Sequence, residues 1–308
     1  MSIIDQYATT QGAGTHPRGE LLSLGPVGLR VTDAAHASRF WQELIGLRPL
    51  DSGVGIDVLG SSSRPLIELR EVASRSVSSG YSGLYHVAVH FPSELEFGRV
   101  IARMMAAGQP ISPVDHLFSK AIYLQDPDSI TVELALETPW RVREMFVDDQ
   151  LGLHAIDRDG QIRRPNEPLD ISGLLSEASG SDLAAPADGA YIGHVHLSVA
   201  DIHAALAFYR DQLGMLEHVS APKLGFADLH AGGDFKHRVA LNTWQSLGAP
   251  PTPTDMAGMD RFTIRLTAHE QLEQAAMRME QAGANLEALD PDGLRVHDPA
   301  GYAIDLVV

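Results

Sequence analysis

A short pattern of alternating hydrophobic and polar residues occurs twice along the chain. Residues 25–33 read GPVGLRVTD, and residues 193–201 read GHVHLSVAD. Alternation with a period of two predicts a β-strand that has one aliphatic face. Each copy leads into a segment with an aromatic pair, Phe40-Trp41 or Phe208-Tyr209, and then into an aliphatic-glycine turn. The chain therefore contains duplicated strand–helix units.

Weaker versions of this pattern divide most of the chain into four units of about fifty residues. The second unit has an expected strand at Leu84–Phe91, an expected helix at Glu94–Ala107 and a last strand at Ile130–Leu136. The fourth has an expected helix at Gln271–Ala282, and a glycine follows both helices. In the second and fourth units an Asp-Pro turn precedes the last strand.

These elements predict an α+β protein built from four βαβββ modules, which pair into two domains with curved, mixed β-sheets. Residues 1–22 are expected to form an N-terminal arm, and residues 23–138 a first domain with modules one and two. Residues 139–189 do not repeat, and we interpret them as a linker with helices near Arg141–Val147 and Ile171–Ala178. Modules three and four form the second domain, residues 190–308.

Composition narrows the class of protein. The hydrophobic fraction of 44% and the charged fraction of 20% are typical of a soluble globular protein. The net charge of −17 argues against nucleic acid as a partner, and the absence of cysteine excludes thiolate metal sites. Because the sequence has neither a signal-like start nor a membrane-length apolar run, we expect a cytoplasmic protein without a membrane partner. A homo-oligomer is possible.

Strand alternation places several histidines on shared faces. His86 and His90 lie on one face of the second unit's first strand, and His194 and His196 lie on one face of the third unit's first strand. Glu133 lies opposite its aliphatic neighbours on the last strand of the second unit. The aliphatic faces should pack under helices, so the histidines should line the concave side. Two imidazoles and one carboxylate are the ligands of non-haem Fe(II) oxygenases.

The units resemble those of the vicinal oxygen chelate superfamily, which includes glyoxalase I, fosfomycin-resistance proteins and type I extradiol dioxygenases. Residues 192–201, 83–89 and 123–128 are similar to segments of the two-domain catechol 2,3-dioxygenases of bacilli, and the resemblance covers residues 24–308. It implies the glyoxalase/bleomycin-resistance/dihydroxybiphenyl dioxygenase fold.

In this superfamily the metal ligands are a histidine at the start of a unit's first strand and a carboxylate on its last strand. In unit order, the histidine position matches Pro26, His86, His194 and Arg261 or Phe262; the carboxylate position matches Glu68 or Ile67, Glu133, Asn242 and Asp305. The resemblance thus implies one metal, held by His86, Glu133 and His194 across the two domains. The metal that the resemblance implies is Fe(II), with Mn(II) as an alternative. The equivalent site of units one and four is predicted to be vestigial.

The resemblance also assigns roles around this metal. Tyr123 precedes Glu133 at the spacing of a tyrosine in extradiol enzymes, His237 matches their acid–base histidine, and His116 matches a further histidine of their site. Residues expected to bind the substrate are Asn242, His196, Trp244 and Phe226.

The resulting prediction is an extradiol dioxygenase that inserts both atoms of O2 into a small aromatic diol of the catechol or hydroquinone type. The net negative charge favours an uncharged diol. Two alternatives stay open: another metalloenzyme of the superfamily, either an isomerase or a thiol transferase, and a metal-free small-molecule-binding protein. Asn242 at a carboxylate position argues against the first, and the presence of His86, His194 and Glu133 argues against the second.

Overall fold

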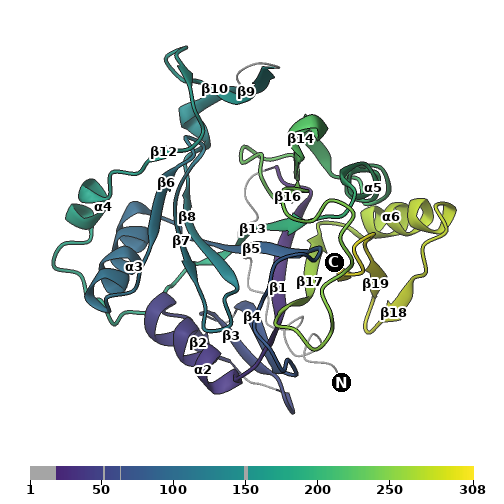
Figure 1. The fold of residues 1–308 in the computed structure, drawn as a ribbon, viewed down its shortest axis with the longest axis horizontal. Helices are drawn as coiled ribbons and strands as arrows, with labels where there is room; N and C mark the ends of the chain where they lie inside the picture. The colour runs from purple at the N-terminus through teal and green to yellow at the C-terminus, as the bar shows by residue number, and fades with distance from the viewer. Residues whose placement is uncertain (1–18, 51–52, 63, 149–151) are drawn as a thin grey trace.

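The computed structural model describes residues 19–50, 53–62, 64–148 and 152–308 (Figure 1). Most of the expected N-terminal arm, residues 1–18, lies outside these ranges. At its end Glu20 is buried, and strand β1 begins at Leu22. Two large sheets form the centre of the molecule, and helices cover their outer faces on both sides of Figure 1.

The first large sheet joins strands from the two ends of the chain. Its order is β18 (Glu287–Leu289), β19 (Gly293–His297), β20 (Ala303–Val307), β17 (Gly258–Leu266), β1 (Leu22–Val31), β4 (Arg64–Glu71), β3 (Asp57–Ser61) and β2 (Arg48–Pro49). The antiparallel pair β1–β17 lies at its centre, so units one and four share this sheet.

The second large sheet joins the middle two units in the same manner. Its order is β12 (Glu167–Pro168), β6 (Ser112–Asp115), β7 (Ser119–Gln125), β8 (Thr131–Glu137), β5 (Gly83–His90), β13 (Tyr191–Ser198), β16 (Val239–Asn242), β15 (Phe226–His230) and β14 (Leu216–Ala221). The antiparallel pair β5–β13 joins unit two to unit three. Strand pairing thus joins unit one to unit four and unit two to unit three. The domain boundaries predicted at residues 138 and 190 follow the sequence repeat instead.

The helices predicted in units two and four are present. The described helical segments are α2 (Ala34–Arg39), η1 (Phe40–Ile45), α3 (Glu94–Ala106), η2 (Pro139–Arg141), α4 (Ser172–Glu177), α5 (Ile202–Leu206), η3 (Ala207–Gln212), η4 (Pro222–Leu224) and α6 (His269–Gln281). The predicted helices α3 and α6 agree with the structure to within two residues. Trp41 and Tyr209, from the duplicated aromatic pairs, are fully buried under the two sheets.

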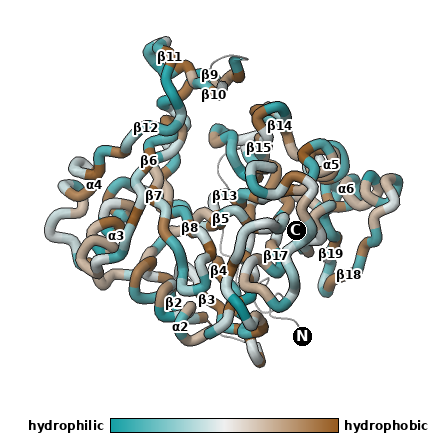
Figure 2. The backbone as a smooth tube through the Cα atoms, in the orientation of Figure 1, coloured by the Kyte–Doolittle hydropathy of each residue, from teal (hydrophilic) through white to brown (hydrophobic). Residues whose placement is uncertain are grey.

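The chain's hydropathy follows this layering. Hydrophobic and hydrophilic residues alternate along α3 and α6 in Figure 2, as expected for helices with one face on a core. In the part of the chain that the structure describes, no helix has the length and apolar character needed to cross a membrane.

One prediction for the linker was wrong. Residues 142–148 form strand β9 (Val142–Asp148) rather than a helix; β9 pairs with β10 (Gly152–Asp157), which also pairs with β11 (Ile162–Arg163). Phe146 lies directly opposite His154 in this hairpin, with ring centroids 5.9 Å apart. The cross-strand pairing satisfies backbone groups that a helix of this length would leave half unpaired. The second predicted linker helix is present as α4.

Candidate metal centre

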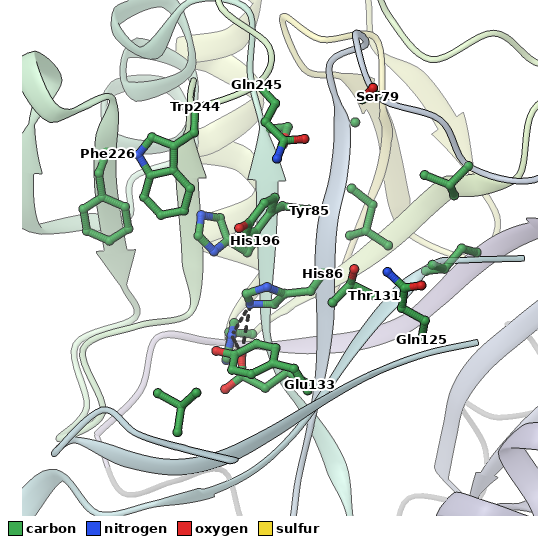
Figure 3. Close-up of a pocket in the computed structure, with 18 of the residues that line it drawn as sticks. Ser79, Tyr85, His86, Gln125, Thr131, Glu133, His196, Phe226, Trp244 and Gln245 are labelled. Atoms are coloured by element: carbon green, nitrogen blue, oxygen red, sulfur yellow. Dashed lines mark hydrogen bonds and ion pairs between the residues drawn. The ribbon is translucent and has the colours of Figure 1, made fainter. Parts of the chain in front are cut away.

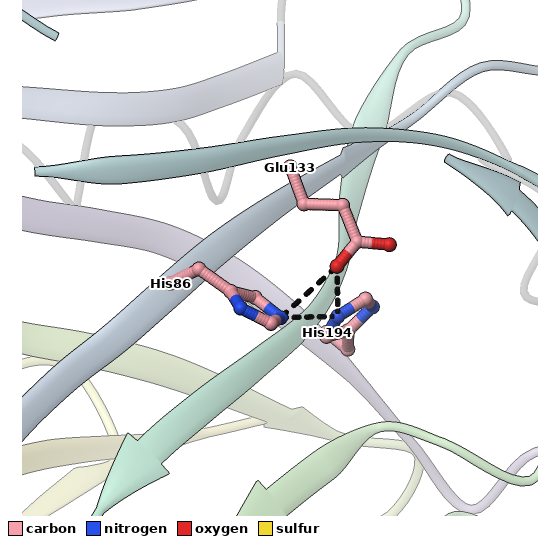
Figure 4. Close-up of side chains that lie close together, drawn as sticks. All are labelled: His86, Glu133 and His194. Carbon is pink, nitrogen blue, oxygen red and sulfur yellow. Dashed lines mark hydrogen bonds and ion pairs between the residues drawn. The ribbon is translucent and has the colours of Figure 1, made fainter. Parts of the chain in front are cut away.

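Three neighbouring strands bring His86, His194 and Glu133 together (Figure 4). His86 lies on β5 and His194 on the adjacent antiparallel strand β13. Glu133 lies on β8, on the other side of β5, where it is paired with Ala88. Ala88 is also the partner of His194, so the strand register places the three side chains on one face of the sheet.

The distances between the three donor atoms fit a metal ion. His86 Nε2 lies 3.0 Å from His194 Nε2 and 3.0 Å from a Glu133 carboxylate oxygen, and His194 Nε2 lies 3.1 Å from that oxygen. Neighbouring ligands of an octahedral ion at roughly 2.1 Å stand roughly 3.0 Å apart, whereas tetrahedral ligands at that distance stand roughly 3.4 Å apart. The donors therefore fit three neighbouring corners of an octahedron.

Burial sets the protonation of this group. Burial lowers the pKa of His86, and it lowers the pKa of His194 well below its usual value. Burial alone would raise the pKa of Glu133, but its contacts with His194 and His86 lower that pKa well below the usual range. Two neutral imidazoles and one carboxylate leave a buried negative charge that needs a cation.

A second histidine fixes the orientation of His194. His90 Nδ1 donates to the Glu137 carboxylate at 2.9 Å, so His90 Nε2 accepts a hydrogen bond from His194 Nδ1 at 3.0 Å. His194 Nε2 then carries the lone pair that faces His86 and Glu133. Gly193 makes room for this contact, because a Cβ atom there would lie 2.0 Å from the His90 ring.

His237 lies beside the three donors and is held by a carboxylate. Its ring centroid is 4.7 Å from that of His194, and its Nδ1 donates to Asp228 at 2.9 Å. Asp228 is fully buried on β15 and also accepts from His218 at 3.2 Å and from the Val219 backbone at 2.8 Å. His237 Nε2 is therefore the nitrogen left to exchange a proton with a ligand.

Tyr123 and His116 form a second hydrogen-bonded pair near Glu133. His116 Nδ1 lies 2.9 Å from the Pro165 carbonyl and 2.7 Å from the Asn166 side-chain oxygen, so it carries the proton. His116 Nε2 consequently accepts from the Tyr123 hydroxyl at 2.8 Å. Burial and then the nearby Glu133 charge raise the pKa of Tyr123 well above its usual value, so the phenol stays protonated.

The register corrects the assignment of Asn242. Ala240, rather than Asn242, pairs with His196 in the way that Glu133 pairs with Ala88, so Ala240 occupies the carboxylate position of unit three. Asn242 is fully buried behind His196 and donates to its Nε2 at 2.9 Å. Asn242, predicted to bind substrate, is not among the residues that line the cavity, and its hydrogen bond orients His196. The absence of a fourth ligand is unchanged, because alanine has no donor atom.

A cavity of about 1110 Å³ opens over the three donors (Figure 3). The predicted site residues that line it are His86, His116, Tyr123, Glu133, His194, His196, Phe226, His237 and Trp244. Sequence reasoning placed His90 on the same face as His86 but gave it no role, and it missed Asp228 and Tyr85. Tyr85 stands beside His86 on β5 and had no signal beyond its position, while Asp228 and His90 act through contacts between strands.

The equivalent place in the other sheet holds an arginine. Arg261 lies opposite Gly28 as His86 lies opposite His196, and Phe262 is in the core. The Arg261 guanidinium contacts Glu68, and its Nε lies 3.5 Å from Asp305. Arg295 also binds Asp305 through two hydrogen bonds of 2.6 and 2.8 Å.

Comparison with known proteins identifies the family. The model of the Glyoxalase/Bleomycin resistance protein/Dioxygenase superfamily matches residues 23–134 and 191–306. The chain belongs to this superfamily. It is 31% identical over 284 residues to catechol-2,3-dioxygenase of Bacillus subtilis strain 168, a match that covers 91% of this chain and 95% of that protein. The resemblance inferred from the repeated segments is thereby confirmed.

Solved structures show the same fold at low identity. A protein described as a dioxygenase of Bacillus subtilis has a TM-score of 0.60 at 10% identity, with 94% of this chain and 85% of that chain covered. Glyoxalase I of Zea mays has a TM-score of 0.55 at 16% identity, with 93% and 92% covered. The predicted fold class is confirmed.

Proposed function

We propose that this protein is an Fe(II)-dependent extradiol dioxygenase that cleaves the ring of a catechol-type or hydroquinone-type aromatic and inserts both atoms of O2. The main support is the buried set of His86, His194 and Glu133, whose donor atoms lie 3.0 to 3.1 Å apart. Similarity to a protein named catechol-2,3-dioxygenase supports the same reaction.

The donor set fits iron by its chemistry. Two histidines and one carboxylate on one side of an ion leave its remaining positions open, as in non-haem Fe(II) oxygenases, and Mn(II) accepts the same ligands. Fe(II) bound there would supply the Lewis acidity that favours loss of a diol proton and the electrons that activate O2.

His237 is the residue suited to receive the diol proton. Its Nδ1 proton is held by Asp228, so Nε2 presents a lone pair inside the cavity. Once His237 is protonated, the Asp228 carboxylate 2.9 Å away stabilises the imidazolium. His237 can then return the proton to the opened ring, as an acid–base residue.

Tyr123 is suited to position the diol. Its phenol is protonated, and His116 fixes the direction of its hydroxyl from the outer side. A substrate oxygen beside Glu133 would therefore meet the oxygen of Tyr123 rather than a charged group. An isomerase of the glyoxalase type is less favoured, because Ala240 leaves the site without a second carboxylate.

The test is reconstitution of metal-free protein with Fe(II), Mn(II) or Zn(II) without oxygen, followed by addition of O2 and a panel of catechols and hydroquinones. The Fe(II) form is expected to consume one O2 per ring opened and to produce ring-fission absorbance, while the Zn(II) form consumes none. Absence of oxygen uptake by protein that contains stoichiometric iron, across the whole panel, would overturn the proposal.

A further inference from the structure

The cavity over the three donor residues is larger than a single-ring diol requires. Its volume of about 1110 Å³ lies slightly above the range found for pockets that hold drug-sized ligands, about 300–1000 Å³. A dihydroxybenzene is much smaller than a drug-sized ligand. If the diol lies at His86, His194 and Glu133, most of the cavity remains for the rest of the substrate.

A row of aromatic rings leads from the donor residues toward solvent. Phe226 stacks on His237 with ring centroids 6.5 Å apart and an interplanar angle of 19°, and Trp244 stacks on Phe226 at 6.0 Å and 11°. The rings of Tyr85 and Trp244 are nearly perpendicular, with centroids 5.5 Å apart. In Figure 3, Phe226 and Trp244 lie beside His196 on one side of His86, and Gln125 and Thr131 lie on the other.

Trp244 ends this row and is available to a ligand. Its side chain is 53% exposed, although tryptophan is among the residues that gain most from burial. The indole nitrogen donates to the Leu224 carbonyl at 3.0 Å, which fixes the plane of the ring. A fixed and half-exposed indole at the edge of a cavity is a stacking surface for a flat apolar group.

The charges around the cavity are of one sign. Among the lining residues that the structure describes, none is lysine or arginine, and the acidic ones are Glu133, Asp228 and Glu167. Asp228 and Glu167 are already paired, with His237 and Arg163 respectively. The remaining polar groups include the uncharged side chains of Gln125, Thr131 and Gln245. A carboxylate on the substrate would find no lysine or arginine here, and an amine would find Asp228 and Glu167 already paired, so either charge would be desolvated without compensation.

We infer that the substrate is an uncharged aromatic diol with a large apolar substituent, which lies against Phe226, Trp244 and Tyr85 while the diol lies at the three donor residues. The inference rests on the proposed function for the position of the diol. It names a substrate class: a diol with a second ring or a comparable flat apolar group, and without a carboxylate or an amine.

The test compares diols that differ only in the group on the ring. Fe(II)-loaded protein is assayed with 4-methylcatechol, 4-phenylcatechol, 3,4-dihydroxybenzoate and dopamine. We expect kcat/KM for 4-phenylcatechol to exceed that for 4-methylcatechol by about tenfold, the gain of an aromatic contact and its buried area. The benzoate and the amine should lie at least about tenfold below 4-methylcatechol.

Two tryptophan variants locate the effect. Trp244→Ala should reduce the phenyl-to-methyl ratio of kcat/KM by at least about fivefold. Trp140→Ala is the matched control, because Trp140 is also exposed, at 63%, and does not line the cavity; its ratio should equal that of the unaltered protein. A ratio at or below one in the unaltered protein, an equal fall in both variants, or a preference for the benzoate or the amine would overturn the inference.

Failure of the proposed function can be distinguished from failure of the substrate class by a binding measurement. If no diol is cleaved, the binding of the same four compounds to Zn(II)-loaded protein is measured by isothermal titration calorimetry. A dissociation constant for 4-phenylcatechol about tenfold lower than for 4-methylcatechol, lost in Trp244→Ala, would support the substrate class without the reaction. Equal dissociation constants for the two diols would contradict the substrate class.

Discussion

The centres of the two large sheets share one strand register but carry different side chains: an arginine in one, and in the other the three donors that we propose bind a metal. In the β5–β13 sheet, His86 lies opposite His196, and Glu133 is held on the parallel strand β8. In the β1–β17 sheet, Arg261 lies opposite Gly28, and Asp305 is held on the parallel strand β20. Pro26 stands in the first sheet's copy of the position that His194 occupies in the other.

Both centres bury carboxylates, and each needs a positive charge. In the β1–β17 centre arginine side chains of the protein supply the positive charge. Arg261 contacts Glu68 and Asp305, and Arg295 also binds Asp305. Burial still raises the pKa of Glu68, although Arg261 opposes the shift. In the β5–β13 centre the imidazoles of His86 and His194 contact Glu133, and we propose that a bound metal ion balances its charge. We call the cluster of Arg261, Glu68 and Asp305 the closed centre, and the group of His86, His194 and Glu133, which we propose binds a metal, the open centre.

The largest effect is expected from removal of a donor at the open centre. His194→Ala should lower bound metal from about one per chain to near zero and reduce activity more than about 10³-fold, because three ligands leave no spare. Metal content by mass spectrometry and oxygen uptake measure this. Pro26→Ala, at the equivalent position of the other centre, should change neither. Retained metal in His194→Ala, or loss in Pro26→Ala, would contradict the comparison.

A smaller effect on activity is expected from His237. His237→Ala should keep its metal and lose about 10²–10⁴-fold in kcat, the contribution of an acid–base residue. Asp228→Asn should lose less, since the imidazole stays in place. His218→Ala is the control, because His218 shares Asp228 but does not line the large cavity. If His237→Ala loses as much metal as His194→Ala, His237 is a ligand instead.

In the closed centre the expected effect is on stability alone. Arg261→Met removes the partner of buried Glu68 and should cost about 3–5 kcal/mol in the free energy of unfolding, measured with urea. Metal content and kcat/KM should stay as they were. Arg210→Met, which breaks an exposed pair with Asp211 and Glu217, should cost at most about 1 kcal/mol. A similar cost for both variants would mean that the Arg261 cluster does not neutralise a buried charge.

The smallest effect concerns the Asp-Pro turn of unit four. Burial raises the pKa of Asp298 to about 6, even though Tyr209 donates to it at 2.9 Å. A raised carboxyl pKa stabilises the fold at low pH, and this contribution is lost as the pH rises through about 6. Relative to Asp298→Asn, the unaltered protein should therefore lose on the order of 1 kcal/mol between pH 5 and pH 7. Asp292→Asn, at an exposed residue, should show no such difference.

Much of the open centre was predictable because two periodicities coincide. Alternation along each strand places His86 and His194 on a face opposite the aliphatic residues, and the repeat places them at the same position of two units. Helices α3 and α6 were predictable for the same reason, because apolar spacing and a following glycine agree.

The remainder depends on contacts that local patterns do not encode. The choice between Ala240 and Asn242 depends on the register between two parallel strands. A shift of two residues would leave the same side chains on the same face, so alternation alone cannot decide between these positions. Asp228 reaches His237 only through the pairing of β15 with β16, and His90 reaches His194 only because Gly193 has no side chain. Strand β9 is set by its partner β10 rather than by its own sequence.

The central claim is that one of two equivalent centres holds iron and an aromatic diol. The most direct measurement is a crystal structure of the Fe(II)-loaded protein soaked with 4-methylcatechol in the absence of oxygen. The account predicts iron held by His86, His194 and Glu133, both diol oxygens on that iron, and no metal at Glu68 or Asp305. A metal at Glu68 and Asp305, or a diol bound away from the three donor residues, would contradict it.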